Sequence, residues 1–159
     1  MKPNSIAHRM TKLLLDIMFY LGIVWIVLSP FLARMCGRWF YGNGYASFWH
    51  VNGVVWPLSG LLGVGIVFFL RKMFRSLLGG DPFIEENVKS FQTIAFLCGG
   101  ISVLYFIKCG LMLFYYFYLF SVSSVMIAAV FFIGMLFCFT LQYLFAQAVC
   151  YKQENDLTI

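Results

Sequence analysis

Charged residues are scarce in this chain of 159 residues. Only 11% are Asp, Glu, Lys or Arg, whereas roughly 25% of a typical soluble domain is charged. Hydrophobic residues reach 62%, far above what a water-soluble fold carries, so a soluble domain is not expected. We interpret the net charge of +5 as the result of basic residues that orient the chain in a membrane and attract it to lipid headgroups. We expect no direct nucleic-acid contact.

Motifs that carry chemistry are also missing. The two histidines, His8 and His50, are expected on opposite sides of a membrane, so they cannot share a metal site. The sequence has no P-loop, no G-x-G-x-x-G and no H-E-x-x-H. The five cysteines include no C-x-x-C pair, and Cys36 with Cys109 is the one pair that is expected to be able to meet. We therefore predict a protein that is not an enzyme and holds no cofactor or metal.

Four apolar segments are long enough to cross a membrane as helices, which takes about 20 residues. They cover approximately residues 13–33, 51–70, 93–116 and 122–150. Their apolar runs are continuous and lack the alternation of barrel strands. The predicted fold class is an all-α membrane protein, a single domain over residues 1–159 with four transmembrane helices.

Lysine and arginine residues near the ends of the spans set the expected orientation, because cytoplasmic loops are enriched in them. On one side of the membrane, the connections contain only Arg34 and Arg38. The termini and the central connection, on the other side of the membrane, contain Lys2, Arg9, Lys12, Arg71, Lys72, Arg75, Lys89 and Lys152. We therefore predict a multi-pass protein of the inner, cytoplasmic membrane, with both termini and the central connection in the cytoplasm.

The connection between the first two spans, residues 34–52, combines many aromatic residues with Gly37, Gly42 and Gly44. The glycines are expected to break any long helix there. The aromatic side chains are expected to lie at the outer interface, and ligand binding by this loop is the alternative. A second outer connection is expected near Tyr118–Ser124.

The central connection, residues 71–92, is the one long charged segment inside the apolar sequence. Apolar residues recur at helical spacing as the second span runs into it: Leu70, Met73, Phe74, Leu77 and Leu78. The second helix should therefore continue beyond the membrane until Gly79 and Gly80 stop it. Asp81 suits the cap and Pro82 the first position of the next helix. The pattern predicts a cytoplasmic helical hairpin that extends spans 2 and 3.

Opposite charges face each other across this predicted hairpin. The basic face of its first helix, formed by Arg71, Lys72 and Arg75, is expected to meet Glu85 and Glu86 on its second helix. Exposed ion pairs contribute little to stability, so apolar packing must hold the two helices together. At this point a well-built loop without further role and a surface that docks a partner both remain open.

Two ionisable residues lie inside the spans, where a charged side chain is a functional candidate. Asp16 is one turn inside the first span, and we expect it to pair with Lys12 or with an arginine of the central connection. Lys108 lies roughly 20 Å along the third span, far from all six acidic residues. We expect its ammonium group to snorkel to lipid phosphate. Binding of an anionic ligand or of a partner's carboxylate is the alternative.

Two short segments carry a family resemblance: GGDPFIEENVKSFQTIAF at residues 79–96 and YKQENDLTI at residues 151–159. They resemble a family of small bacterial four-span membrane proteins that is catalogued as a domain of unknown function. The matching residues are Gly80, Asp81, Pro82, Phe83, Asn87, Glu154, Asn155, Asp156, Leu157, Thr158 and Ile159. The chain departs from the family pattern at residues 148–150, where relatives often have a Gly and a charged residue.

Genes of this family often lie beside one for a very small helix-turn-helix regulator, so the resemblance implies a cytosolic DNA-binding partner. The candidate docking residues are Arg71, Lys72, Arg75, Asp81, Pro82, Phe83, Asn87, Glu154 and Asp156. We expect Glu154 and Asp156 to pair with the basic hairpin residues in an off state. The leading hypothesis is a regulatory interaction protein. A small transporter or channel component, a membrane-protective immunity or stress protein, and a homo-oligomer are alternatives.

Overall fold

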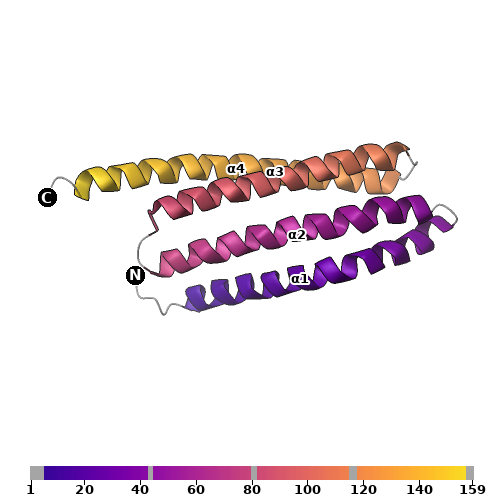
Figure 1. Cartoon of the computed structure of the whole chain (residues 1–159), viewed down its shortest axis with the longest axis horizontal. Helices are drawn as coiled ribbons and strands as arrows, with labels where there is room; N and C mark the ends of the chain where they lie inside the picture. Colours follow the sequence, from indigo (N-terminus) through magenta and orange to yellow (C-terminus); the bar gives the residue numbers. More distant parts are fainter. Residues whose placement is uncertain (1–5, 43–44, 80–81, 115–117, 157–159) are drawn as a thin grey trace.

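Four long helices make up the fold in the computed structural model, which describes residues 6–42, 45–79, 82–114 and 118–156. They are α1 (Ile6–Tyr41), α2 (Tyr45–Leu78), α3 (Glu85–Phe114) and α4 (Tyr118–Asp156). Figure 1 shows an elongated molecule in which each helix runs back along the one before it. The start of α1 and the end of α4 therefore lie at the same end of the molecule, which we call the terminal end.

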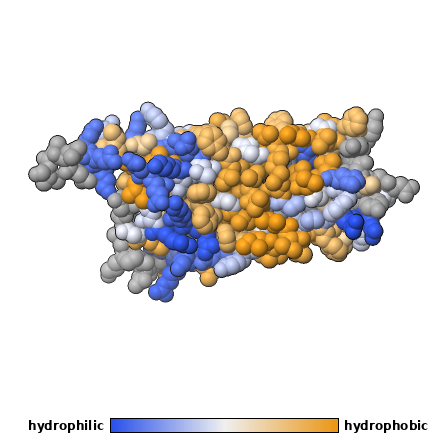
Figure 2. All heavy atoms as spheres, in the orientation of Figure 1, coloured by the Kyte–Doolittle hydropathy of each residue, from blue (hydrophilic) through white to orange (hydrophobic). Residues whose placement is uncertain are grey.

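All four helices are long and apolar enough to cross a membrane, so the chain is a multi-pass membrane protein. Helices suit the hydrocarbon core of a membrane because a helix satisfies its own backbone hydrogen bonds there. Figure 2 shows a hydrophobic belt across the middle of the molecule and hydrophilic residues gathered mainly at the terminal end. Residues 51–70 of α2 carry no Asp, Glu, Lys or Arg and extend for about 30 Å, which matches the hydrocarbon core of a bilayer.

The helices pack in chain order, α1 against α2, α2 against α3 and α3 against α4. Of the four candidate spans, α3 is the most buried and α1 the least. The largest hydrophobic core cluster joins α2, α3 and α4 through Val55, Ile101, Tyr105 and Ala128. Many apolar side chains of α1 remain exposed, which is the expected state for a helix that faces lipid.

Small residues allow two of these helix pairs to approach closely. A Cβ atom on Gly22 of α1 would lie 2.6 Å from Cγ2 of Val64 on α2. A Cβ atom on Gly99 of α3 would lie 2.9 Å from Sδ of Met135 on α4. The absence of a side chain at Gly22 therefore determines how closely α1 can pack on α2, whereas at Gly99 the flexible Met135 side chain can adjust.

The expected outer loop over residues 34–52 is wrong, because both of its flanks are helical. α1 continues through Gly37, which is buried, and ends only beside Gly42, whose φ of 47° suits glycine. α2 begins again at Tyr45. The second outer connection was also placed too late, since α4 starts at Tyr118. Leaving backbone groups unpaired near hydrocarbon is costly, so Gly37 remains in the helix, whereas α1 does end beside Gly42 and Gly44 lies outside the described residues.

The central turn is partly as expected. α2 ends at Leu78, and the amide of Gly79 donates hydrogen bonds to the carbonyls of Arg75 and Ser76 at 3.0 and 3.1 Å. Gly80 and Asp81, the predicted stop and cap, lie outside the described residues. Pro82 does not begin the next helix, because α3 starts only at Glu85. At the C-terminus α4 runs on to Asp156, so most of the predicted tail continues that helix.

Candidate functional site

A short turn at the terminal end, Pro82 to Ile84, is held in place by the side chain of Asn87. Nδ2 of Asn87 donates to the carbonyl oxygen of Pro82 at 2.8 Å and to Oγ of Ser76 at 3.2 Å. The Asn87 amide nitrogen also donates to the carbonyl oxygen of Ile84 at 3.0 Å. Asn87 is itself buried, so its hydrogen bonds are shielded from water. One side chain thus links the turn to the last turns of α2.

Aromatic contacts join the same turn to α4. The ring centroid of Phe145 lies 5.5 Å from that of Phe83 and 4.9 Å from that of Phe91. Such distances are typical of favourable aromatic pairs. Phe91 is buried, but Phe83 keeps 42% of its surface exposed. The turn therefore presents an exposed phenyl ring from a position fixed by both α2 and α4.

An apolar cavity of about 310 Å³ opens beside this turn. Its walls come from α1, α2, the turn and α4: Thr11, Leu15, Leu70, Met73, Phe74, Leu77, Pro82, Asn87 and Phe145. Leu77 and Phe83 are both exposed at this end of the molecule, where hydrophilic residues gather (Figure 2) and where Ile6, Met10 and Tyr151 are exposed as well. We call this feature, with its exposed Phe83, the terminal groove.

Two ion pairs lie on opposite sides of α2. Nζ of Lys72 is 2.8 Å from Oε1 of Glu86 on α3, which confirms the expected pairing across the hairpin. Nη2 of Arg71 is 2.5 Å from Oδ1 of Asp16 on α1, which confirms that Asp16 pairs with an arginine of the central connection. The guanidinium of Arg71 also lies 4.7 Å from the ring centroid of Phe19, a cation–π contact.

The structure brings only some of the predicted docking residues together. Pro82, Phe83 and Asn87 meet at the turn, whereas Arg71 faces α1 and Lys72 faces α3. Arg75 lines a separate cavity between α1 and α2. Glu154 lies on the last turns of α4, where its Oε1 accepts a weak hydrogen bond from Sγ of Cys150 at 3.7 Å. Asp81 and the side chain of Asp156 lie outside the described residues, and the off-state pairing stays a prediction.

Lys108 does not snorkel to the lipid, so that expectation is wrong. Its side chain is 2% exposed and points back along α3 toward Tyr105, one turn earlier. Nζ lies 4.9 Å from the ring centroid of Tyr105 and 5.7 Å from that of Trp56 on α2. Two aromatic faces thus take the place of an anionic partner, because ring faces attract cations most strongly where water is excluded.

Asn52 is a buried polar residue that the sequence analysis missed. Nδ2 donates to the carbonyl oxygen of Phe48 at 3.0 Å and approaches Sδ of Met112 at 3.9 Å. Oδ1 is buried and has no hydrogen-bond partner among the described residues. The sequence did contain a signal for this burial, namely an amide side chain within an apolar helix, one turn before Trp56. An amide there prefers the protein interior to lipid.

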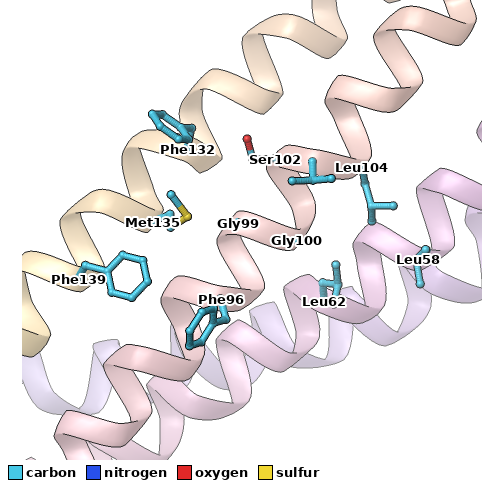
Figure 3. Close-up of a pocket in the computed structure, with 11 residues that line it drawn as sticks. Leu58, Leu62, Phe96, Gly99, Gly100, Ser102, Leu104, Phe132, Met135 and Phe139 are labelled. Atoms are coloured by element: carbon cyan, nitrogen blue, oxygen red, sulfur yellow. The ribbon is translucent and has the colours of Figure 1, made fainter.

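Two further cavities among the described residues are lined mainly by apolar side chains. One, of about 660 Å³, lies between α1 and α2, and the other, of about 600 Å³, lies between α2, α3 and α4. Figure 3 shows the second, with Leu58 and Leu62 on one side and Phe132 and Phe139 on the other. Its polar lining residue, Ser102, already donates to the carbonyl of Ala128 at 2.9 Å. Such cavities fit lipid chains and offer no reactive group.

A family model described as "Protein of unknown function (DUF2975)" matches residues 43–159. The chain belongs to this family. The match includes α2, α3, α4 and the whole turn around Asn87, whereas α1 precedes the matched range. It confirms the resemblance to a family of unknown function. No curated protein and no solved structure matches the chain.

Within the described ranges, no three His, Cys, Asp or Glu side chains are grouped to hold a metal ion. The five cysteines are all free thiols, so Cys36 and Cys109 are not joined. The main polar features of the described residues are the turn around Asn87, the ion pairs beside it, and the buried Lys108 and Asn52.

Proposed function

We propose that this protein is a non-enzymatic interaction protein of the cytoplasmic membrane that docks a cytosolic protein in the terminal groove. The observation that supports this most directly is the groove itself, an apolar cavity with an exposed phenyl ring at the hydrophilic end of the molecule. Exposed apolar surface in water is unfavourable unless a partner covers it. The excess of Lys and Arg at this end supports a cytoplasmic location for it under the positive-inside rule.

The groove is built on a rigid base, which favours binding. Asn87 fixes the turn to α2 and Phe145 fixes it to α4, so a partner orders few side chains when it binds. Preorganisation of this kind increases affinity because less conformational entropy is lost. Phe83 has the size and the partial exposure of an interface anchor.

Charge around the groove indicates the chemistry of the partner. Arg9, Lys12 and Arg75 lie at the same end of α1 and α2, and all three are exposed. None of the three lines the terminal groove, but together they make this end of the molecule basic, which favours a partner whose apolar anchor is flanked by acidic residues. A small DNA-binding regulator, which the family resemblance implies, is the partner class that we propose, and its capture at the membrane makes the protein regulatory.

A transport or channel role has less support. The cavities of about 660 and 600 Å³ are lined almost entirely by apolar side chains. A solute path needs polar groups along its length. The buried polar residues Lys108 and Asn52 are each packed against neighbouring side chains and line none of these cavities.

Site-specific photocrosslinking in intact bacteria tests the proposal. A photoreactive amino acid at Phe83 should yield a crosslinked cytosolic protein. The same amino acid at Trp39, which is 86% exposed at the opposite end, should not. Replacing Leu77 with Glu should abolish the Phe83 crosslink, because it places a charge beside the apolar cavity. Absence of any cytosolic crosslink from Phe83, with the protein present in the membrane at normal level, would rule out the docking role.

A further inference from the structure

We infer that a second cavity at the terminal end, between α1 and α2, binds the phosphate group of an anionic phospholipid. The cavity has a volume of about 110 Å³. Its lining side chains are Lys12, Leu15, Asp16, Arg71, Phe74, Arg75 and Leu78. Three cations and one carboxylate therefore meet there, and they come from two different helices. We call it the basic cavity.

The positive charge of the basic cavity is only partly compensated. Asp16 neutralises Arg71 through their ion pair. Lys12 and Arg75 have no carboxylate partner among the described residues, since the remaining ion pair joins Lys72 to Glu86. The cavity thus keeps an excess of two positive charges. Phosphate oxygens are the acceptors that such N–H donors bind most strongly.

The basic cavity lies where the hydrocarbon core ends. The uncharged part of α2, residues 51–70, stops immediately before Arg71, and the uncharged part of α1, residues 17–33, starts immediately after Asp16. Lys12 and Arg75 are each four residues, or about 6 Å, farther from the hydrocarbon than the ion pair. That displacement takes them from the edge of the hydrocarbon to the level of the headgroup phosphates.

The arrangement of the cavity suits a lipid better than a soluble anion. Asp16 and Phe19 hold the guanidinium of Arg71 in one position, so this group fixes the floor of the cavity. Leu15, Phe74 and Leu78 supply an apolar wall beside the cations. A water molecule occupies about 30 Å³ of liquid, so the volume admits a phosphate group but not a complete lipid. The glycerol and acyl chains would remain outside, against α1 and α2.

Basic pockets between membrane helices bind anionic headgroups by this combination of charge and depth. Free phosphate offers the same oxygens but gains nothing from the apolar wall or from the membrane. We therefore assign the site to the headgroup of a lipid such as phosphatidylglycerol. The basic cavity shares Leu15 and Phe74 with the terminal groove, and Lys12 and Arg75 also contribute to the charge near that groove. The two proposals are distinguished by their measurements, because lipid binding is measured on the purified protein and docking by the crosslink from Phe83.

Native mass spectrometry of the full-length protein tests this assignment. Purified protein in detergent is titrated with phosphatidylglycerol and, separately, with phosphatidylcholine. We expect one tightly bound phosphatidylglycerol per chain and weaker binding of phosphatidylcholine. Replacing Lys12→Gln and Arg75→Gln together should weaken phosphatidylglycerol binding roughly tenfold or more, because each basic residue near an anionic lipid contributes favourably.

A matched control separates the cavity from general charge attraction. Arg9→Gln and Lys89→Gln together remove one Arg and one Lys from the same end, and neither residue lines the basic cavity. This control should bind phosphatidylglycerol as the unmodified chain does. An equal loss in the control would overturn the assignment, because it would show attraction without a site.

A third variant tests the opposite direction and does not depend on the folding of the double variant. Asp16→Asn removes the competing carboxylate and frees Arg71 N–H groups for phosphate. We expect it to tighten phosphatidylglycerol binding several-fold. Weaker or unchanged binding by Asp16→Asn would count against the site.

Inorganic phosphate identifies the source of the phosphate group. Millimolar inorganic phosphate should leave the bound lipid in place if the apolar wall and the lipid tail matter. Displacement of phosphatidylglycerol by inorganic phosphate would overturn the lipid assignment.

Discussion

The side-chain nitrogen of Asn87 lies 2.8 Å from the carbonyl oxygen of Pro82, so a residue in the first turn of α3 holds the turn that leads into its own helix. The same nitrogen reaches Oγ of Ser76 on α2. The terminal groove therefore depends on one buried amide more than on the ion pair nearby, because Lys72 and Glu86 are largely exposed to solvent.

Replacing Asn87 with Ala should loosen this turn. The change removes two hydrogen bonds and leaves the Pro82 carbonyl without its side-chain donor. A loss of about 1–3 kcal/mol in the free energy of unfolding is expected, measured by chemical denaturation in detergent micelles. Hydrogen exchange at the amide of Gly79 should also accelerate.

The control for this change is Gln92→Ala, on the exposed side of the same helix. It should alter neither the free energy of unfolding nor the exchange rate at Gly79. Equal effects from the two variants would show that the turn does not depend on Asn87.

Replacing Gly22 with Ala should separate α1 from α2. The added Cβ would come within 2.6 Å of the branched Val64 side chain, which cannot move aside easily. Overpacking of this kind costs about 1–3 kcal/mol, again measured by chemical denaturation. Gly63→Ala is the matched control, because a Cβ there meets nothing within 4 Å and should be tolerated. A stable Gly22→Ala variant would mean that α1 and α2 pack less tightly than the structure shows.

Substitutions at Lys108 test its contacts with the rings of Tyr105 and Trp56. Lys108→Met should fold and remain about as stable as the unmodified chain, because an apolar side chain of similar length avoids burying a charge. Lys108→Glu should be strongly destabilised, since ring faces repel anions and two rings adjoin the position. Yield of monodisperse protein and its melting temperature measure both effects. A well-folded Lys108→Glu variant would contradict the burial of this side chain.

The predicted orientation is tested by labelling with a membrane-impermeant maleimide. Single cysteines at Trp39 and Phe83, in a variant without the five native cysteines, mark the two ends of the molecule. In intact cells we expect labelling at position 39 only, and in opened cells labelling at both. Labelling of position 83 in intact cells would reverse the orientation and exclude a cytosolic partner at the terminal groove.

Sequence reasoning located the elements that depend on composition. It found four membrane-spanning segments, because hydrocarbon accepts only long apolar helices. It also anticipated the end of α2 before Gly79 and the pairing of Asp16 with an arginine. Each of these follows from local pattern or from the high cost of a lone charge in a membrane.

Two of the expectations that failed each have their own physical cause. Gly37 was expected to break the helix by the standards of a soluble protein, but in a membrane the cost of open backbone groups keeps it helical, whereas the expected break at Gly42 does occur. Lys108 was expected to snorkel because no carboxylate was within reach. Periodicity did not show that Tyr105 and Trp56 would present their rings to it.

By itself, then, the sequence determined the class of protein, the number of spans and the concentration of charge at one end, because these depend on how many apolar residues follow one another. Only the tertiary structure decided which side chains meet. Asn87 reaches Pro82 and Ser76, Phe145 reaches Phe83, and Lys12 joins Arg75 around one cavity, through the packing of each helix against the next. Those contacts depend on the rotation of each helix about its axis, which close packing between neighbours fixes and which no single helix encodes.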